Sequence, residues 1–148
     1  MIKYQIIPME VSHVGDVSRI EAECFSSPFK EKDLISYLSD TLWHFLVAVD
    51  ENGAVLGHIS LSIILDECQI VNVAVDPSYR RQGIGKNLVS SAISLGGSNG
   101  AKKFFLEVRK SNASAISLYN ALGFLQVGVS KNHYSQPRED AILMNLEL

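Results

Sequence analysis

One stretch of this chain constrains its fold more than any other: an apolar run leads into a basic, glycine-containing turn and then into a helix. The run Val71–Val75 ends at Asp76-Pro77, and Arg80–Lys86 brings arginines, glycines and a lysine before the helical pattern continues. Unpaired N–H groups at a helix N-terminus attract anions, and glycine lets the main chain approach an oxygen closely. Basic side chains add countercharge for more than one phosphate. The stretch therefore predicts a diphosphate-binding turn.

The turn by itself leaves two interpretations open. It lacks the Gly-Lys-Ser or Gly-Lys-Thr ending of a Walker loop, and it lacks the third glycine of the dinucleotide-binding fingerprint. A basic, flexible loop between a strand and a helix would contain the same residue types. The remaining sequence has to decide between a loop and an anion site.

Hydrophobic periodicity predicts the elements on either side of this turn. Period-two patterns between turn signals predict strands at Ile2–Ile7, Trp43–Val49, Ala54–Leu65, Cys68–Val75, Lys103–Val108, Gly123–Val129 and Ala141–Leu146. Helical periodicity predicts helices at Val11–Cys24, Glu31–Leu38, Gly83–Leu95 and Asn112–Leu122. Ser12 is a candidate N-cap, and Gly123 is expected at the C′ position of the last helix. Gly96-Gly97 are expected to end the third helix early, because glycine inside a helix costs up to about 1 kcal/mol relative to alanine.

The order of these elements indicates the fold class. The strands Trp43–Val49, Ala54–Leu65 and Cys68–Val75 follow one another through short turns, which predicts an antiparallel meander. The later order of strand, helix, strand, helix and strand implies a parallel pair within a mostly antiparallel sheet. We therefore expect an α+β fold in a single domain over residues 1–148, with a mixed sheet covered by helices.

Composition argues against several classes of protein. A net charge of −3 is a poor match to a domain that binds nucleic-acid phosphates. Apolar stretches such as Ile63–Leu65 are too short to span a bilayer, and the first ten residues lack the pattern of a signal peptide. Cys24 and Cys68 show no metal-binding or redox spacing, so we expect reduced, buried thiols. We expect a cytoplasmic protein with no metal, no direct nucleic-acid binding and no membrane attachment.

The full pattern around the turn is more specific than its glycines. The spacing Arg-x-x-Gly-x-Gly at Arg80–Gly85, after the strand end Val73–Tyr79, resembles the acetyl-CoA signature of the GNAT superfamily of N-acetyltransferases. Leu106–Arg109, Ser111-Asn112 and Leu118–Phe124 resemble the later motifs of that superfamily. The resemblance covers about residues 43–146. It implies a GNAT-like α/β/α layered fold, with a mixed, mostly antiparallel central sheet of about seven strands flanked by about four helices.

The resemblance also implies how acetyl-CoA is bound, in a cleft where the strands of Val71–Val75 and Phe104–Val108 splay apart. The backbone N–H near Val73 would polarise the thioester carbonyl, as an oxyanion-hole donor does. Asn112 would contact the pantetheine arm of CoA, although its residue type also fits a simple N-cap. The residues expected to bind the cosubstrate are Val73, Ala74, Val75, Arg80, Arg81, Gln82, Gly83, Ile84, Gly85, Lys86, Asn112 and Tyr119.

Glu107 and Tyr119 are the candidate catalytic residues. Glu107 shares a strand face with Phe105, so partial desolvation would favour its uncharged form and make it a base near neutral pH. The alternative from the residues alone is a glutamate paired across the sheet with a cation. Tyr119 shares its helix face with apolar residues and by itself fits a core tyrosine. The resemblance implies that Glu107 is the general base, acting through water, and that Tyr119 protonates the departing CoA thiolate.

The acceptor amine is indicated mainly by resemblance. An N-terminal α-amine has a pKa near 8, against about 10.4 for lysine, so one modest base suffices for the α-amine. This argument permits a lysine or a small amine as well. The closing segment His133–Met144, together with Ile20–Phe25 and Pro28-Phe29, resembles the ribosomal-protein-alanine N-acetyltransferases. Those enzymes acetylate the N-terminal alanine of ribosomal protein S18.

That closer resemblance implies that the N-terminus of an S18-like protein is the substrate, contacted by Phe29, Asn72, Tyr134 and Arg138. The chain departs from the pattern at His133, where the family often has tyrosine, and at Phe29, where it often has tryptophan. From the residues alone, Arg138-Glu139-Asp140 also fits a charged turn before the last strand. Two other functions remain open: a small-molecule amine acetyltransferase of the same fold, acting for example on a polyamine or an aminoglycoside, and a non-catalytic acyl-CoA-binding module.

Overall fold

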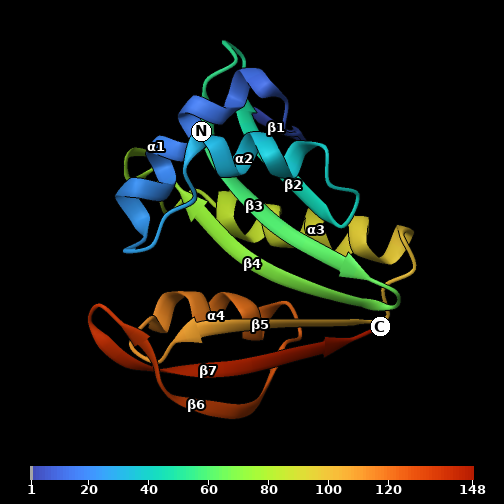
Figure 1. Cartoon of the computed structure of the whole chain (residues 1–148), viewed down its shortest axis with the longest axis vertical. Coiled ribbons are helices and arrows are strands. Elements are labelled where there is room, and N and C mark those ends of the chain that lie inside the picture. The colour runs from blue at the N-terminus through green and yellow to red at the C-terminus, as the bar shows by residue number, and fades with distance from the viewer. Residues whose placement is uncertain (1) are drawn as a thin grey trace.

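The strands of this chain form one mixed sheet. The computed structural model describes residues 2–148, and its seven strands follow the order β1-β2-β3-β4-β5-β7-β6 (Figure 1). The strands are β1 Tyr4–Pro8, β2 Trp43–Asp50, β3 Val55–Ile64, β4 Glu67–Val75, β5 Lys103–Arg109, β6 Leu125–Ser135 and β7 Arg138–Glu147. The helices are α1 Val14–Cys24, α2 Glu31–Leu38, α3 Ile84–Ser98 and α4 Ala113–Ala121, with 3-10 turns η1 Val11–His13 and η2 Pro77–Tyr79. Only β4 and β5 pair parallel, so the expected mixed α+β sheet is confirmed.

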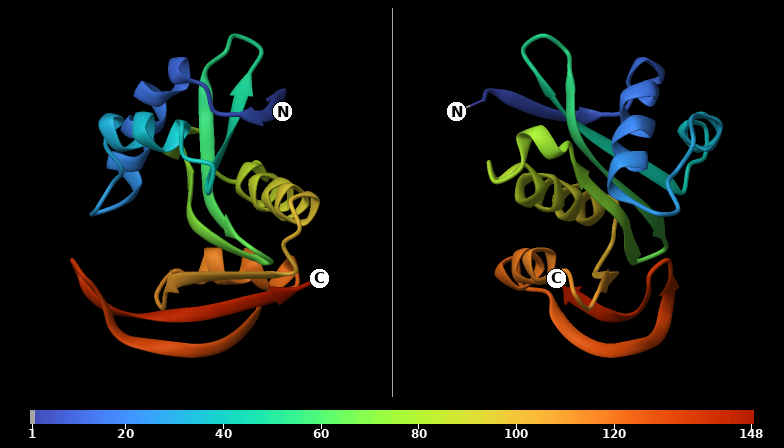
Figure 2. Two further views of the ribbon diagram at one scale, coloured as in Figure 1. Left: turned by 45° about the vertical axis from the view of Figure 1, so that its right-hand side comes forward. Right: turned by 90° about the vertical axis from the view of Figure 1, so that its left-hand side faces the viewer.

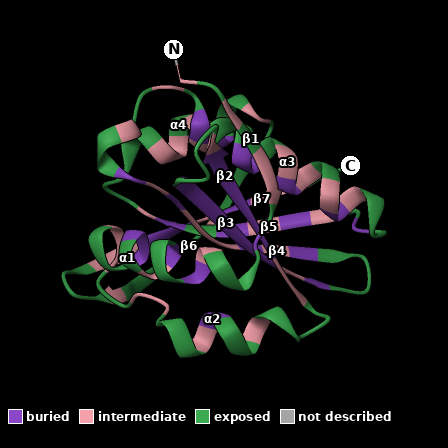
Figure 3. Ribbon diagram, turned by 90° about the horizontal axis from the view of Figure 1, so that it is seen from above, coloured by how far each residue is buried: buried purple, intermediate pink, exposed green. Residues whose placement is uncertain are grey.

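The helices cover the sheet in two layers. α1 and α2 lie on one face, and α3 and α4 lie on the other (Figure 2). Val17 and Leu34 belong to a buried cluster under α1 and α2, while Leu88 of α3 and Tyr119 of α4 belong to a second cluster. Burial is concentrated along the central strands (Figure 3), as expected for a sheet covered on both faces. The two cores hold in place the helix ends around the candidate site.

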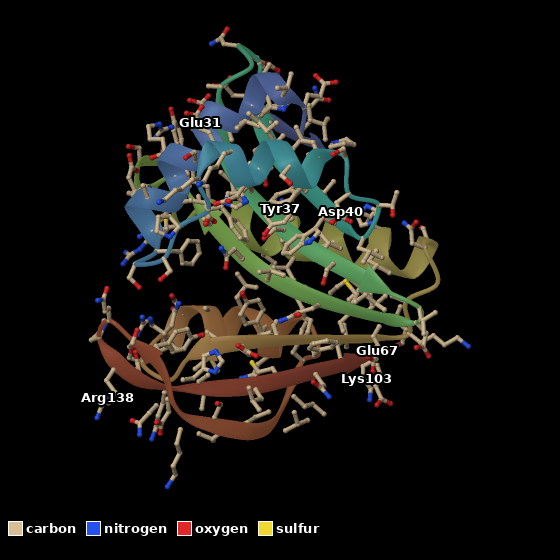
Figure 4. The ribbon with its side chains drawn as sticks, viewed as in Figure 1. Glu31, Tyr37, Asp40, Glu67, Lys103 and Arg138 are labelled. Atoms are coloured by element: carbon tan, nitrogen blue, oxygen red, sulfur yellow. The ribbon has the colours of Figure 1, made fainter. Side chains whose placement is uncertain are left out.

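β4 and β5 separate soon after they begin to pair. Within the described chain their pairing extends only from Glu67 to Gln69 on β4, opposite Lys103–Phe105 on β5. The two strands then diverge (Figure 1), and the labelled Glu67 and Lys103 mark the paired end in Figure 4. The β3–β4 ladder shifts register after Ser60, which leaves Val71 without a partner. Because a bulge bends the strand that carries it, this shift helps to turn β4 away from β5.

The N-terminal helix begins later than predicted, and the proposed cap is wrong. Ser12 lies inside η1, and α1 starts only at Val14. The backbone N–H of Glu10 donates to Nδ1 of His13 at 2.9 Å, so a histidine side chain organises this entry. A short 3-10 turn before an α-helix is common at helix termini, and it moves the cap position away from Ser12.

The last hairpin is longer than its apolar residues indicated. β6 continues to Ser135 and β7 begins at Arg138, with Tyr134 opposite Glu139. Arg138-Glu139-Asp140 is therefore part of a strand, and the charged-turn alternative is wrong. Side chains in this part of the hairpin are mostly polar, so the period-two apolar pattern that marks a half-buried strand is absent.

The prediction that α3 ends before Gly96-Gly97 is also wrong, because α3 continues to Ser98. Gly96 is fully enclosed by the helix and β5: a Cβ at this position would lie 2.5 Å from Cε2 of Phe104. The glycine therefore lets α3 approach the sheet more closely than alanine allows. Its cost in helix propensity is offset by the packing of the buried Phe104 ring against the backbone.

We expect Gly96→Ala to lower the free energy of unfolding by about 1–3 kcal/mol, because the new methyl group overpacks the core against Phe104. Gly97→Ala is the matched control. Its nearest neighbour is the flexible Cδ1 of Leu148 at 3.3 Å, and it gains about 1 kcal/mol of helix propensity. Urea unfolding followed by circular dichroism measures both. A Gly96→Ala protein as stable as the Gly97→Ala protein would contradict this account.

Candidate active site

The end of β4 is fixed by a set of polar contacts around Asp76. The Asp76 carboxylate accepts from the backbone N–H of Ser78 at 2.9 Å and from Arg19 of α1 at 3.2 Å. Both contacts favour the charged carboxylate and lower the pKa of Asp76, and the backbone N–H of Ser78 has the largest effect. The aspartate thus caps η2 and ties α1 to the turn that follows β4.

The exposed side chain of Arg80 folds back onto the end of β4. Its Nε donates to the carbonyl of Val75 at 3.3 Å, and a terminal nitrogen lies 3.3 Å from Sγ of Cys24. The carbonyl of Val75, at the end of β4 where pairing with β5 has stopped, is therefore satisfied by Arg80. The Arg80 side chain therefore braces the turn, while its guanidinium stays exposed beside it.

The N-terminus of α3 has the geometry of an anion site. Gly83 is its N-cap residue, with φ 80° and no side-chain cap, and Arg81 also has positive φ at 65°. Asn87 is the first residue that donates back into the helix, to the carbonyl of Gly83 at 3.0 Å. The amides of Ile84, Gly85 and Lys86 therefore have no acceptor within the helix and point out of its positive end. A left-handed residue without a Cβ keeps this end open.

α4 places the predicted tyrosine and asparagine beside β5. The side chain of Asn112 accepts from the backbone N–H of Ala115 at 3.2 Å, so Asn112 is an N-cap. Tyr119 is buried against Phe124, with ring centroids 5.8 Å apart. Burial, with a smaller effect from Tyr134, raises the pKa of Tyr119 to about 12. The phenol therefore keeps its proton across the physiological range.

A pocket lies between the α1–α2 loop and the β6–β7 hairpin. It has a volume of about 500 Å³ and is lined by Cys24, Phe25, Ser26, Ser27, Asn72, Arg109, His133, Tyr134, Ser135, Gln136 and Pro137. One wall comes from the N-terminal half of the chain and the other from the C-terminal hairpin. The pocket therefore opens on the side of the sheet opposite α3 and α4.

Glu107 lies beside this pocket without lining it. Its Oε2 lies 2.7 Å from Nε2 of His133, and the side chains are 39% and 33% exposed. The predicted desolvation of Glu107 is therefore wrong, because β6 leaves that face of β5 partly open. The alternative, a glutamate paired with a cation across the sheet, agrees better with the structure, and the partner is His133.

Arg109 ties the hairpin to β5. It donates to the carbonyls of Pro137 at 2.9 Å and Gln136 at 3.1 Å, and it pairs with Glu139 at 3.3 Å. Its guanidinium also lies 4.2 Å from the centroid of the Tyr134 ring. Burial, Glu107 and Glu139 raise the pKa of Tyr134, against the opposing effect of Arg109. These contacts fix Tyr134 and the tip of the hairpin at the pocket.

A buried carboxylate supports the opposite wall. Glu21 of α1 is fully buried and accepts from the Asn72 side chain at 3.0 Å and from the backbone N–H of Phe29 at 3.0 Å. Its Oε2 also lies 2.8 Å from Nε2 of His58, an ion-pair distance at which the N–H is not aligned for a hydrogen bond. A buried carboxylate needs such partners. Glu21 therefore joins the α1–α2 loop to β4 and orients Asn72.

The structure brings together only some of the predicted substrate residues. Asn72 and Tyr134 line the pocket. Phe29 instead packs in an aromatic cluster with Tyr37, Trp43 and Phe45, and the exposed Arg138 lies outside the lining. Figure 4 shows Arg138 at the far end of the hairpin.

Sequence reasoning missed Glu21 as a site residue, and it missed the contact between His133 and Glu107. Glu21 carried a signal, since it is a carboxylate on the buried face of α1 with Val14, Val17 and Ile20. The resemblance indicated His133 as a departure close to the substrate peptide, and His133 does line the pocket. Its approach to Glu107 depends on a bulge in β6.

Several remaining features bear on cofactors and thiols. Both cysteines are free; Cys68 is buried, and burial raises its pKa to about 12. Cys24 is only partly buried, contrary to expectation, and lines the pocket. Within residues 2–148, no cluster of three or more His, Cys, Asp or Glu side chains is placed to hold a metal ion. In the same range, none of the helices has the length and apolar character needed to cross a membrane.

Comparisons with known proteins agree with this geometry. The model of the acetyltransferase (GNAT) family matches residues 14–124. The ribosomal protein bS18-alanine N-acetyltransferase of Escherichia coli K12 is 34% identical over 145 residues, which cover 97% of each chain. The enzyme of that name from Salmonella typhimurium is 33% identical over 132 residues, 88% of each chain. The crystal structure of the Escherichia coli ribosomal-protein-S18-alanine N-acetyltransferase superposes with a TM-score of 0.87 at 33% identity, covering 98% of this chain and 94% of that one.

We expect Asp76→Ala to lower the free energy of unfolding by about 1–2 kcal/mol at pH 7, through loss of the cap and of the Arg19 contact. Because the folded pKa of Asp76 is depressed, this stability is fully present above the unfolded pKa of about 3.9 and is lost as pH falls through the folded value. The difference from wild type should therefore shrink below about pH 4. Urea unfolding at several pH values measures it.

Asp16→Ala is the control for this measurement, since Asp16 reaches the same Arg19 from the exposed surface at 4.0 Å. We expect a change within about 0.5 kcal/mol. A loss of stability for Asp76→Ala that stayed constant down to pH 2 would contradict a role for the charged carboxylate.

Proposed function

Because the chain belongs to the GNAT family of acetyltransferases, we propose that it transfers the acetyl group of acetyl-CoA to the N-terminal α-amine of a protein, specifically to the N-terminal alanine of ribosomal protein bS18. The observation that carries the proposal is the open gap between β4 and β5, with the uncapped N-terminus of α3 at one end and a pocket at the other. The relatives named for bS18 cover nearly the whole chain. A ribosomal substrate places the reaction in the cytoplasm.

The turn after β4 fits the diphosphate of CoA. Outward amides at Ile84–Lys86 supply hydrogen-bond donors to phosphate oxygens, and Arg81 and Lys86 supply countercharge. Val73, Ala74 and Val75 lie on the part of β4 that β5 leaves unpaired, so the main-chain groups there that neither β3 nor Arg80 engages can bind an extended ligand as a missing strand would. The proposed cosubstrate site therefore comprises this strand edge, the segment Arg80–Lys86, and Asn112 and Tyr119 of the α4 region.

Acetyl-CoA supplies the activated acetyl group as a thioester, and the residues of the chain manage protons around it. The backbone near Val73 is assigned to polarise the thioester carbonyl. Tyr119 is assigned to protonate the sulfur of the departing CoA, because its buried hydroxyl keeps its proton. Glu107 is assigned to promote removal of the amine proton by its negative charge. The proton is transferred through a group that lies between the amine and the carboxylate.

The pocket supports a peptide N-terminus as acceptor. Its walls present Asn72, Tyr134 and the carbonyl-rich tip of the hairpin, and such groups hydrogen-bond a free amine and a peptide backbone. Ser26 and Ser27 add small polar side chains to the lining beside Phe25. Phe29 acts on substrate through the loop it anchors, and Arg138 lies where later residues of a peptide would leave the pocket.

Acetylation assays test the acceptor directly. We expect a peptide with the N-terminal sequence of bS18 to release CoA and to gain one acetyl group at its α-amine, mapped by mass spectrometry. The same peptide with a blocked N-terminus is the control and should remain unmodified. Preferred acetylation of a polyamine or aminoglycoside would instead establish a small-molecule enzyme. Binding of acetyl-CoA without CoA release with any amine would establish a non-catalytic module, and absence of CoA binding would refute the site.

We expect Tyr119→Phe to lower kcat by about 100-fold or more, because it removes the proton donor while keeping the ring that packs on Phe124. The KM for acetyl-CoA should change little. Steady-state kinetics with the bS18 peptide measures this, with Tyr37→Phe in the aromatic cluster as control. The assigned role predicts no alkaline loss of rate from Tyr119 below about pH 10, because the pKa of Tyr119 is about 12. A Tyr119→Phe enzyme with wild-type kcat would remove Tyr119 from the mechanism.

A further inference from the structure

His133 is the residue that connects the pocket to Glu107. It lines the pocket, whereas Glu107 does not. Its Nε2 lies 2.7 Å from Oε2 of Glu107. No other hydrogen bond or ion pair to the Glu107 side chain exists within residues 2–148. A proton that leaves an amine in the pocket therefore meets His133 before it meets the carboxylate.

The position of His133 is built into the hairpin. The β6–β7 register jumps between Ser130 and Tyr134, so that His133 lies in a bulge opposite β7. Asn132 adopts a left-handed backbone with φ 52°, and its N–H donates to the Asp140 carboxylate at 2.8 Å. Asparagine tolerates this conformation better than most residues. A bulge re-aims a side chain, and here it turns the imidazole across β7 toward β5.

Both ring nitrogens of His133 have a defined neighbour. Nε2 faces Glu107, and Nδ1 lies 3.3 Å from the hydroxyl oxygen of Ser130. A carboxylate beside one nitrogen holds the proton on that nitrogen and leaves the other as the basic site. The neutral ring therefore carries its N–H toward Glu107, and Nδ1 accepts from Ser130. A carboxylate on one nitrogen orients the imidazole and stabilises the imidazolium that forms when the other nitrogen accepts a proton.

We propose that His133 takes the proton from the substrate amine, and that Glu107 fixes the imidazole and balances the charge it gains. The inference rests on the proposed function and identifies the group through which Glu107 acts. In the step, an N–H bond of the ammonium breaks and its electron pair stays on the amine nitrogen. An N–H bond forms at Nδ1 in place of the contact from Ser130. The resulting imidazolium forms an ion pair with Glu107 until solvent removes the proton.

General proton affinities favour this assignment over an isolated carboxylate. An ordinary α-amine has a pKa near 8, an ordinary imidazole near 6.5 and an ordinary glutamate near 4.3. Transfer to an imidazole is therefore less unfavourable than transfer to a solvent-exposed carboxylate, and general bases work best when the two values are close.

The other groups around His133 leave its proton-accepting role intact. Glu107 and Arg109 face it from β5, and Arg109 is engaged by Glu139 of β7 and by hairpin carbonyls. The ring of Tyr134 packs edge-on against the ring of His133, with the ring centroids 4.9 Å apart. Tyr134 stays protonated, because burial raises the pKa of its hydroxyl. Asp140 is bound by the Asn132 amide. Cys24 of α1, on the far pocket wall, has its pKa raised by burial and stays a thiol.

The test measures kcat for acetylation of the bS18 peptide by the His133→Gln and His133→Phe variants. Each value is compared with that of the wild-type enzyme. Glutamine keeps an N–H that can reach Glu107 but cannot accept a proton. We expect both variants to lose about 100-fold in kcat, with unchanged affinity for acetyl-CoA. His44→Gln on β2 is the matched control and should keep wild-type kcat. Thermal unfolding of each variant checks that the hairpin still folds.

Two further measurements separate proton transfer from simple packing. The ratio of wild-type to His133→Gln rates cancels the ionisation of the peptide, and we expect this ratio to rise with pH, because only an uncharged imidazole can accept a proton. The double variant of His133→Gln and Glu107→Gln should be no slower than the slower single variant, because the two residues act as a unit.

Each opposite result overturns the inference. If His133→Gln keeps wild-type kcat while His133→Phe loses it, the histidine only holds Glu107. A constant rate ratio across pH, or losses that multiply in the double variant, also excludes proton transfer by His133. These outcomes leave the proposed function standing, whereas a wild-type enzyme inactive on every N-terminal peptide would remove the proposed function itself.

Discussion

The separation of β4 from β5 is the constraint on which the rest of the structure depends. Parallel pairing ends at Gln69 and Phe105, and every strand group beyond that point needs another partner or a ligand. Arg80 satisfies the last carbonyl of β4, and the remaining edge faces the gap. α3 borders the gap because it follows β4 in the chain, and α4 borders it because it follows β5. An unpaired strand edge inside a sheet is costly unless a ligand uses it, which supports the proposed site at this gap.

Two buried or half-buried carboxylates hold the walls of the site in place. Glu21 fixes the α1–α2 loop to Asn72 of β4, and Glu139 anchors Arg109 and the backbone N–H of Ser111 to the hairpin. The Ser111 contact, as the largest cause, and Arg109 lower the pKa of Glu139. Both carboxylates act between elements that are far apart in the chain. The pocket is therefore a product of tertiary contacts, although the loops that line it are short and polar.

The hairpin β6–β7 carries the histidine on which the proposed proton transfer depends. A histidine in the bulge reaches Glu107, and the neighbouring Tyr134 lies under the Arg109 guanidinium. The same bulge that exposes polar side chains to the pocket leaves Glu107 partly open to solvent. A carboxylate in that setting gains from a partner that accepts protons more readily than it does. The residue at position 133 and the exposure of Glu107 therefore belong to one arrangement.

The sequence by itself determined the element types and the mixed sheet, because hydrophobic period, glycine positions and helix ends are local properties of the chain. It indicated the turn at Arg80–Lys86 that is proposed to bind the diphosphate. It also identified Asn72, Glu107, Tyr119 and Tyr134 as site candidates, mainly through resemblance. The tertiary structure alone decided that Gly96 continues α3 against Phe104, that Arg80 bonds the Val75 carbonyl, and that Glu21 reaches Asn72 and His133 reaches Glu107. These outcomes depend on close approach and on paired polar groups from distant segments, and neither property has a period that can be recognised along one chain.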